Sequence, residues 1–184
     1  MSSVDLPSIK SIERYAFQDC TNLTNVKFGK ELVSIGWRAF YYCQSFERIT
    51  LPLKDYMLTY DNIFKCCDKL DRIDLVGGVK ETIDALLLEE WKNDMNEEIN
   101  AVNQILPNTS AGNEFFDKGE YAVAIRSWIT SVLQKIIHYK AEHRRILNDA
   151  AATLQSSLPN DIVLKNVLPF LELPPYTFQG ENSD

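Results

Sequence analysis

The residues best suited to metal or redox chemistry are four cysteines, three of which recur at a regular spacing. Cys20, Cys43 and Cys67 are separated by 23 and 24 residues, and Cys66 adjoins the last of them. Thiols gathered in one column could hold a metal ion or form a disulfide. Zinc sites, however, usually take cysteines in C-x-x-C pairs, a spacing that these residues do not have. A buried thiol also packs as a small hydrophobe. We therefore expect reduced, structural cysteines and neither a metal nor a cofactor.

The histidines and paired carboxylates are the other groups that could do acid–base chemistry. His138 and His143 lie five residues apart, whereas residues on one helical face are three or four apart. We expect both on a helix surface. The pairs Glu97–Glu98 and Asp71/Asp74 are typical of solvated faces. The sequence has no glycine-rich phosphate loop, nucleophile elbow or H-E-x-x-H motif. These observations predict that the chain is not an enzyme.

The cysteines belong to a longer pattern that must position them. The segment Ile12–Phe28 recurs as Ile35–Leu51, and a looser copy runs from Asn62 to Leu75. A fixed period of this length indicates stacked supersecondary units. The recurring apolar columns are Phe17/Phe40/Phe64, Leu23/Phe46/Leu70, Val26/Ile49/Ile73 and Phe28/Leu51/Leu75.

Each column predicts a place in the stack. The last two apolar positions of a unit alternate at period two, as in a strand with one buried face. A second extended segment precedes each phenylalanine, at Ile9–Ile12 and again at Leu32–Ile35. The third copy has no residue that clearly continues the column of Ile12 and Ile35, since Leu58 lies one residue out of phase. One unit cannot bury its apolar face alone, so the units must stack.

The pattern I-x-x-x-A-F-x-x-C-x-x-L-x-x-I-x-L resembles the BspA-type leucine-rich repeat over roughly residues 4–78. The resemblance implies a short leucine-rich repeat solenoid of about three repeats of 23–24 residues. Members of this family are generally interaction scaffolds or surface recognition proteins. The repeat itself carries no catalytic residue to transfer to this chain.

After residue 78 the apolar spacing becomes helical, which gives an α+β fold overall. Positions three or four apart predict a helix over about 80–106 and a long helix over about 120–158. We expect the two helices to pair as a long antiparallel hairpin, with Trp91 and Trp128 in the seam. The first apolar face comprises Ile83, Leu87, Trp91, Met95, Ile99, Val102 and Leu106.

The predicted domains are therefore the repeats (1–78), an α-helical subdomain that caps the solenoid (79–175) and a flexible tail (176–184). The segment Glu90–Ile99, the repeats and the Val-Leu-Pro-Phe-Leu-Glu-Leu stretch near the end together resemble expanded leucine-rich repeat families of diatoms. Those families imply an architecture and no activity.

Charge and hydropathy exclude some classes of partner. Residues 1–78 carry 10 basic and 10 acidic residues, whereas residues 79–184 carry 9 and 16, so the formal charge of −7 comes from the second part. A nucleic-acid surface needs clustered basic residues, so we expect no nucleic-acid partner. No apolar run approaches the roughly 20 residues that span a bilayer. The lack of a signal peptide and the unpaired cysteines favour a cytoplasmic or nuclear location.

The exposed face of the repeat strands is the remaining candidate for a partner surface. Positions between the inward ones form mixed polar and charged columns, which a solenoid can present to another protein. Solvated strand faces without a partner have the same composition. The candidate residues are Asn25, Lys27, Arg48, Thr50, Arg72 and Asp74.

The sequence thus predicts a non-catalytic protein–protein interaction module, with the identity of its partner open. One alternative is a cell-surface adhesin or receptor whose signal and upstream repeats are missing from this chain. Another is a truncated repeat protein with a purely structural role. Little sequence precedes Leu23–Phe28, which we expect to be the first strand. Its uncapped edge predicts self-association or addition of a strand from another chain.

Overall fold

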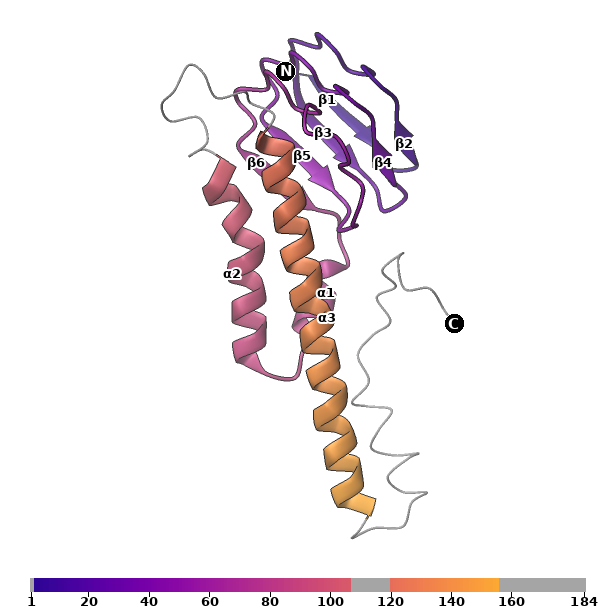
Figure 1. Cartoon of the computed structure of the whole chain (residues 1–184), viewed down its shortest axis with the longest axis vertical. Coiled ribbons are helices and arrows are strands. Elements are labelled where there is room, and N and C mark those ends of the chain that lie inside the picture. Colours follow the sequence, from indigo (N-terminus) through magenta and orange to yellow (C-terminus); the bar gives the residue numbers. More distant parts are fainter. Residues whose placement is uncertain (1, 107–119, 156–184) are drawn as a thin grey trace.

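The computed structural model describes residues 2–106 and 120–155, which form a β-solenoid of about three turns followed by helices (Figure 1). The fold class is that of a short repeat solenoid with a helical C-terminal part, as predicted. The strands are β1 (Ser2–Leu6), β2 (Ser11–Ile12), β3 (Leu23–Phe28), β4 (Ser34–Ile35), β5 (Arg48–Leu51) and β6 (Arg72–Leu75).

The strands form two parallel sheets on two sides of the solenoid. One sheet has the order β1-β3-β5-β6 and the other pairs β2 with β4. The expectation that Leu23–Phe28 is an uncapped first strand is wrong, because β1 pairs with it in parallel. Val4 lies opposite Val26 and Leu6 opposite Phe28, so the first residues continue the same apolar columns. The outer edge of the sheet is therefore β1.

The repeated apolar columns form the core, as predicted. Phe40 is fully buried, and its ring is stacked on Phe17 at 5.1 Å and on Phe64 at 5.6 Å between centroids. Phe46 stacks on Phe40 from the neighbouring column at 5.0 Å. The second sheet ends after two strands. In the third turn, the carbonyl of Met57 accepts a backbone hydrogen bond from the amide of Ile35 in β4.

The turns of the solenoid use left-handed backbone at residues other than glycine. Tyr15 and Arg38 have φ of 61° and 55° at equivalent repeat positions, and Asp19 and Tyr42 form a second equivalent pair at 58° and 61°. Tyr56 also adopts φ of 57°. Side chains with a Cβ disfavour this region, so the stacking of the rungs must impose it.

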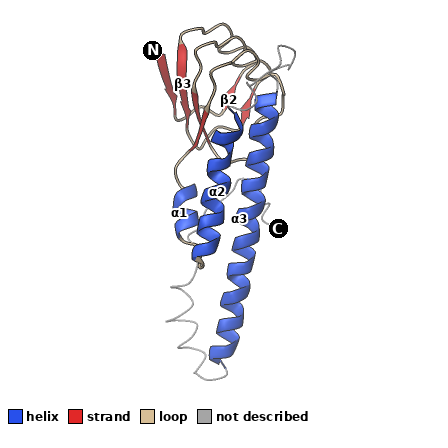
Figure 2. Ribbon diagram, turned by 90° about the vertical axis from the view of Figure 1, so that its left-hand side faces the viewer, coloured by secondary structure: helices blue, strands red, loops and turns tan. Residues whose placement is uncertain are grey.

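Among the residues that the structure describes, the helices after the solenoid are α1 (Val79–Asp84), α2 (Glu89–Ile105) and α3 (Glu120–Gln155) (Figure 2). Gly78 precedes α1 at φ of 106°, a conformation that glycine adopts without a steric penalty. The single helix predicted over 80–106 is wrong, because the chain leaves helical geometry between α1 and α2 and Leu88 is extended. The break turns Leu87 outward, so this member of the predicted apolar face is 40% exposed.

Residues of α2 and α3 contact one another along a shared seam. The Trp128 indole donates a hydrogen bond to the carbonyl of Glu98 at 2.8 Å, and Trp91 stacks on Tyr139 at 5.2 Å. Both tryptophans thus contact the opposite helix. The buried residues of these helices and of the solenoid belong to one continuous apolar core.

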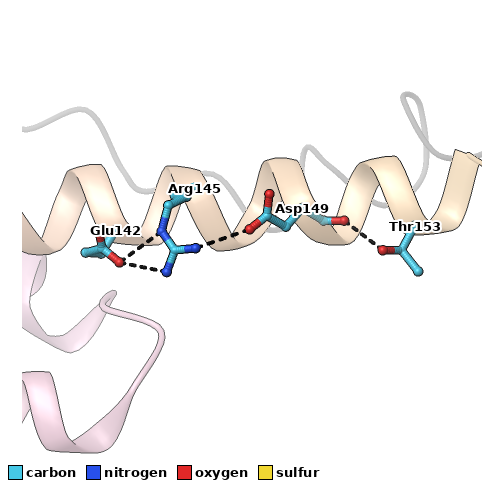
Figure 3. A network of polar contacts seen from close by, with 4 residues as sticks. All are labelled: Glu142, Arg145, Asp149 and Thr153. Atoms are coloured by element: carbon cyan, nitrogen blue, oxygen red, sulfur yellow. Dashed lines mark hydrogen bonds and ion pairs between the residues drawn. The ribbon is translucent and has the colours of Figure 1, made fainter.

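The C-terminal half of α3 extends past α2 (Figure 1). Local polar pairs support it there: Arg145 contacts Glu142 at 2.9 Å and Asp149 at 3.3 Å (Figure 3). Such pairs, three or four residues apart, stabilise a helix locally. His138 is exposed as predicted, whereas the surface prediction for His143 is wrong because only 4% of it is exposed. Within the described ranges, no helix has both the length and the apolar character to cross a membrane.

Candidate functional site

The predicted partner surface lies on the outward face of the four-stranded sheet, where strand register places its residues in two rows. Asn25, Arg48 and Arg72 are direct neighbours across β3, β5 and β6. In the second row, Lys27 lies beside Thr50, and Thr50 lies beside Asp74, across the same three strands. All six candidate residues therefore lie on one face. Alternation along each strand sends their apolar neighbours into the core.

Asp74 links the two arginines of this face. The Arg48 Nε lies 3.2 Å from one carboxylate oxygen of Asp74, and the Arg72 Nε lies 3.2 Å from the other. Neighbouring guanidinium groups repel one another, so a carboxylate between them keeps both in fixed positions. The arginine side chains remain 43% and 55% exposed. Their remaining N–H groups are thus accessible to a partner.

The row of Asn25 continues onto β1. The Asn25 side-chain amide donates to the Ser3 hydroxyl at 3.0 Å. Its amide oxygen is buried and accepts no hydrogen bond from any described residue. A shallow groove of about 390 Å³ runs along this row. Its lining comprises Ser3, Thr24, Asn25, Glu47, Arg48, Asp71 and Arg72.

Ser3 is the residue of this surface that sequence reasoning missed. The repeat pattern begins after it, and the first residues lack the phenylalanine and cysteine columns. The available signal was the alternation of Val4 and Leu6, which matches Val26 and Phe28 in the next turn. With β1 placed, the face extends across four strands and is wider than the repeats alone predict.

The cysteine column is part of the core. The Cys43 thiol donates to the carbonyl of Phe17 at 3.0 Å, and the Cys67 thiol donates to the carbonyl of Phe40 at 2.9 Å. The contact with the Cys43 thiol, together with burial, raises the pKa of Cys67. A thiol that stays protonated is a poor nucleophile and metal ligand. None of the four cysteines is in a disulfide bond, and the described residues contain no group of three metal-ligating side chains.

A second polar cluster joins α2 to α3. The Lys135 ammonium lies 3.0 Å from the Asp94 carboxylate and 2.9 Å from Glu98, and the Tyr139 hydroxyl donates to Asp94 at 2.7 Å. The hydrogen bond from Tyr139 lowers the pKa of Asp94, and the bond to Asp94 raises the pKa of Tyr139. The Lys135 contact lowers the pKa of Glu98. These charges are mutually satisfied, so the cluster fixes the helix seam.

Parallel strands on two sides of stacked turns, an internal phenylalanine column and a repeat of 23–24 residues define a solenoid of the leucine-rich repeat class. The family model described as "BspA type leucine rich repeat region (6 copies)" matches residues 1–105. The chain belongs to this family. A search of curated proteins returned no match, and a search of solved structures returned none either.

Proposed function

We propose that this chain is a non-catalytic protein-interaction module whose partner surface is the outward face of β1, β3, β5 and β6. Membership of a leucine-rich repeat family supports a role as an interaction scaffold. The observation that carries the proposal is the in-register row of Asn25, Arg48 and Arg72, with Asp74 between the arginines. Arginine is enriched at protein interfaces because its planar group binds carboxylates and carbonyls in fixed geometry.

We propose further that α2 and α3 form an antiparallel cap on the last turn. Contacts support this: the Asn103 side chain accepts a hydrogen bond from the Ile73 amide at 2.9 Å, on the edge of β6. Arg126 of α3 donates to the carbonyl of Leu58 and pairs with Asp61 at 2.9 Å. A cap of this kind leaves the outward face of the sheet open.

Charge reversal tests the partner surface. The tagged chain and its Arg48→Glu/Arg72→Glu variant would be used to isolate bound proteins from an extract, with identification by mass spectrometry. The matched control is Lys80→Glu/Arg144→Glu, which changes the same total charge at two exposed positions on the helices. We expect proteins that are bound by the wild type and the control to be lost from the variant. Equal binding by all three chains would remove this face from consideration, provided that the thermal melts agree.

Self-association is a second use of the solenoid that we propose, now through β1. In the described part of the chain, β1 pairs with β3 on one side alone. A strand from a second copy would satisfy the backbone groups of the other edge. Sedimentation should therefore show a concentration-dependent dimer. A single monomeric species at high micromolar concentration would contradict it.

A further inference from the structure

A second surface of the solenoid carries two arginines stacked between aromatic rings. The Arg14 guanidinium lies 4.9 Å from the Tyr15 ring centroid and 4.6 Å from that of Trp37. The Arg38 guanidinium lies 4.3 Å from Trp37 and 4.8 Å from Tyr41. We call these five residues the arginine–aromatic stack. They come from the turns that follow β2 and β4, on a different sheet from the partner surface above.

The two guanidinium groups of the stack have no carboxylate partner among the described residues. A guanidinium that lies against a ring engages its flat faces, so the N–H groups at its rim stay available for an anion. Among the described residues, no carboxylate pairs with Arg14 or Arg38, and the Arg38 Nε is buried without an acceptor. Both cations also lie within 5 Å of the same indole, where they repel one another. An anion bound beside the two guanidinium groups would relieve this repulsion.

Two other observations concern the members of the stack. Tyr15 and Arg38 occupy left-handed backbone, where glycine or asparagine is less strained, yet both carry large side chains that enter the stack. Hydrogen bonding to Arg14, and then to Arg38, lowers the pKa of the Tyr15 hydroxyl. The positive charge of the two arginines therefore stabilises the ionised form of Tyr15 within the stack.

A groove adjoins the stack and sets the shape of the ligand. It measures about 560 Å³ and is lined by residues of three successive turns, among them Ser11, Arg14, Ser34, Trp37 and Tyr60. Ligand sites commonly measure about 300–1,000 Å³. Three turns span about 10 Å, which is the length of about three extended residues. Gly36 also lines the groove, but its role is internal: a Cβ there would lie 2.6 Å from the backbone of Arg14.

We propose that this groove binds an extended acidic peptide segment of a protein partner. One carboxylate of the peptide is held by Arg14 in the groove lining, and a second by Arg38, which lies outside the lining against the ring of Trp37. Carboxylates match the rim of a guanidinium in two parallel hydrogen bonds. Tyrosine, tryptophan and arginine are the residues that most often dominate binding at protein interfaces. A nucleic acid fits poorly, because two arginines do not form the basic track that a phosphate backbone needs and Glu13 lines the same groove.

An unbiased selection tests the chemistry of the ligand. A phage library of random dodecapeptides would be selected on the immobilised full chain and, separately, on the Arg14→Gln/Arg38→Asn variant. Asparagine tolerates left-handed backbone, so the variant should keep its fold, which a thermal melt checks. We expect peptides enriched in Asp and Glu from the wild type and not from the variant. Enrichment of neutral or basic peptides, or no enrichment, would overturn the proposal.

A titration then locates the site. The best selected peptide, labelled with fluorescein, should bind the Arg14→Gln/Arg38→Asn variant at least about tenfold more weakly. Arg144→Gln, which removes one positive charge on α3, and Arg48→Glu/Arg72→Glu should leave the affinity unchanged. Removing the repulsion from Glu13 in Glu13→Gln should tighten binding about twofold. Equal affinity in the Arg14→Gln/Arg38→Asn variant would overturn the proposal.

Two comparisons separate the peptide from other anions. The same peptide with Gln and Asn in place of Glu and Asp should lose most of its affinity. A heparin hexasaccharide should compete weakly. If the heparin fragment binds with the same dependence on Arg14 and Arg38, and more tightly than any selected peptide, the ligand is a sulfated glycan and the peptide assignment fails.

Discussion

Side chains in the solenoid contact their own counterparts in the next turn, whereas side chains of α2 and α3 contact unlike partners. Phe40 lies between Phe17 and Phe64, and each belongs to the same column of the repeat. On the helices, Lys135 contacts two carboxylates and Trp128 contacts a backbone carbonyl. The solenoid is thus stabilised by repetition of one apolar contact. The helical part depends on single contacts that occur once.

The largest effect should come from breaking the repeated column at its centre. Phe40→Ala removes a fully buried ring that is stacked on both sides, and should lower the free energy of unfolding by about 3–5 kcal/mol. Urea unfolding followed by circular dichroism measures this loss. Phe17→Ala is the matched control from the same column, because that ring is only partly buried. Phe17→Ala should lower the free energy of unfolding clearly less than Phe40→Ala does. Equal losses would show that the position of a ring in the stack does not matter.

The junction between the two regions should be the next most sensitive place. Asn103→Ala leaves the Ile73 amide without its side-chain acceptor and should cost about 1–3 kcal/mol. Asn96→Ala, at an exposed position of the same helix, should cost far less. Hydrogen exchange of the Ile73 amide should accelerate in the Asn103 variant. Unchanged exchange would mean that the helices do not protect the last strand.

The stability of the seam between α2 and α3 should fall when one charged side chain is removed. Lys135→Met removes two ion pairs from the helix seam and should lower stability by about 1 kcal/mol. Arg144→Met, at an exposed position on the same helix, should change stability little. A thermal melt compares the two variants. A larger loss from the Arg144 variant would contradict the role assigned to the seam.

The same cluster gives the helical part a pH dependence at both ends of the scale. The pKa values of Asp94 and Glu98 lie below their ordinary values, so their stabilisation is complete above about pH 5 and is lost as the pH falls through the folded values. The pKa values of Lys135 and Tyr139 are raised. Their contribution is complete below about pH 9 and is lost as the pH rises through the folded values. Melts of the wild type and Lys135→Met should therefore converge at both extremes.

The smallest expected effect is a gain in stability, from a substitution in a turn of the solenoid. Tyr56 adopts left-handed backbone and is 80% exposed, so Tyr56→Asn removes strain and little packing. Stability should rise by about 0.5 kcal/mol, because asparagine tolerates this conformation. The control Tyr60→Asn changes an exposed tyrosine at ordinary backbone geometry. A gain from both variants would attribute the effect to loss of tyrosine and not to strain.

The two regions also differ in how far sequence predicts them. Columns such as Phe17/Phe40/Phe64 repeat, so a single pattern fixes the strands, the core and the outward positions together. The break between α1 and α2 has no such signal. No proline or glycine interrupts residues 79–106, and Leu87 keeps the helical spacing although it points outward. The burial of His143 likewise depends on tertiary packing, which the spacing of residues along one helix does not encode.

The candidate sites divide in the same way. The row of Asn25, Arg48 and Arg72 follows from the repeat, because alternation along a strand decides which side chains face outward. The arginine–aromatic stack was missed. Two of its repeat columns pair an arginine with an aromatic residue: Arg14 aligns with Trp37, and Tyr15 aligns with Arg38. Neither column repeats the same residue type. A search for complementary residues in one column, and not for identical ones, would have found it.

The thiol–carbonyl contacts between turns bear on how such a chain can lengthen. The middle block carries a thiol, Cys43, that donates to the carbonyl of Phe17 in the block before it, and a carbonyl, that of Phe40, that accepts from Cys67 in the block after it. A tandem duplication of one block therefore inserts a unit that is already complementary to both neighbours. No compensating substitution is required elsewhere. The number of turns can then change in one genetic step, and with it the width of the surface offered to a partner.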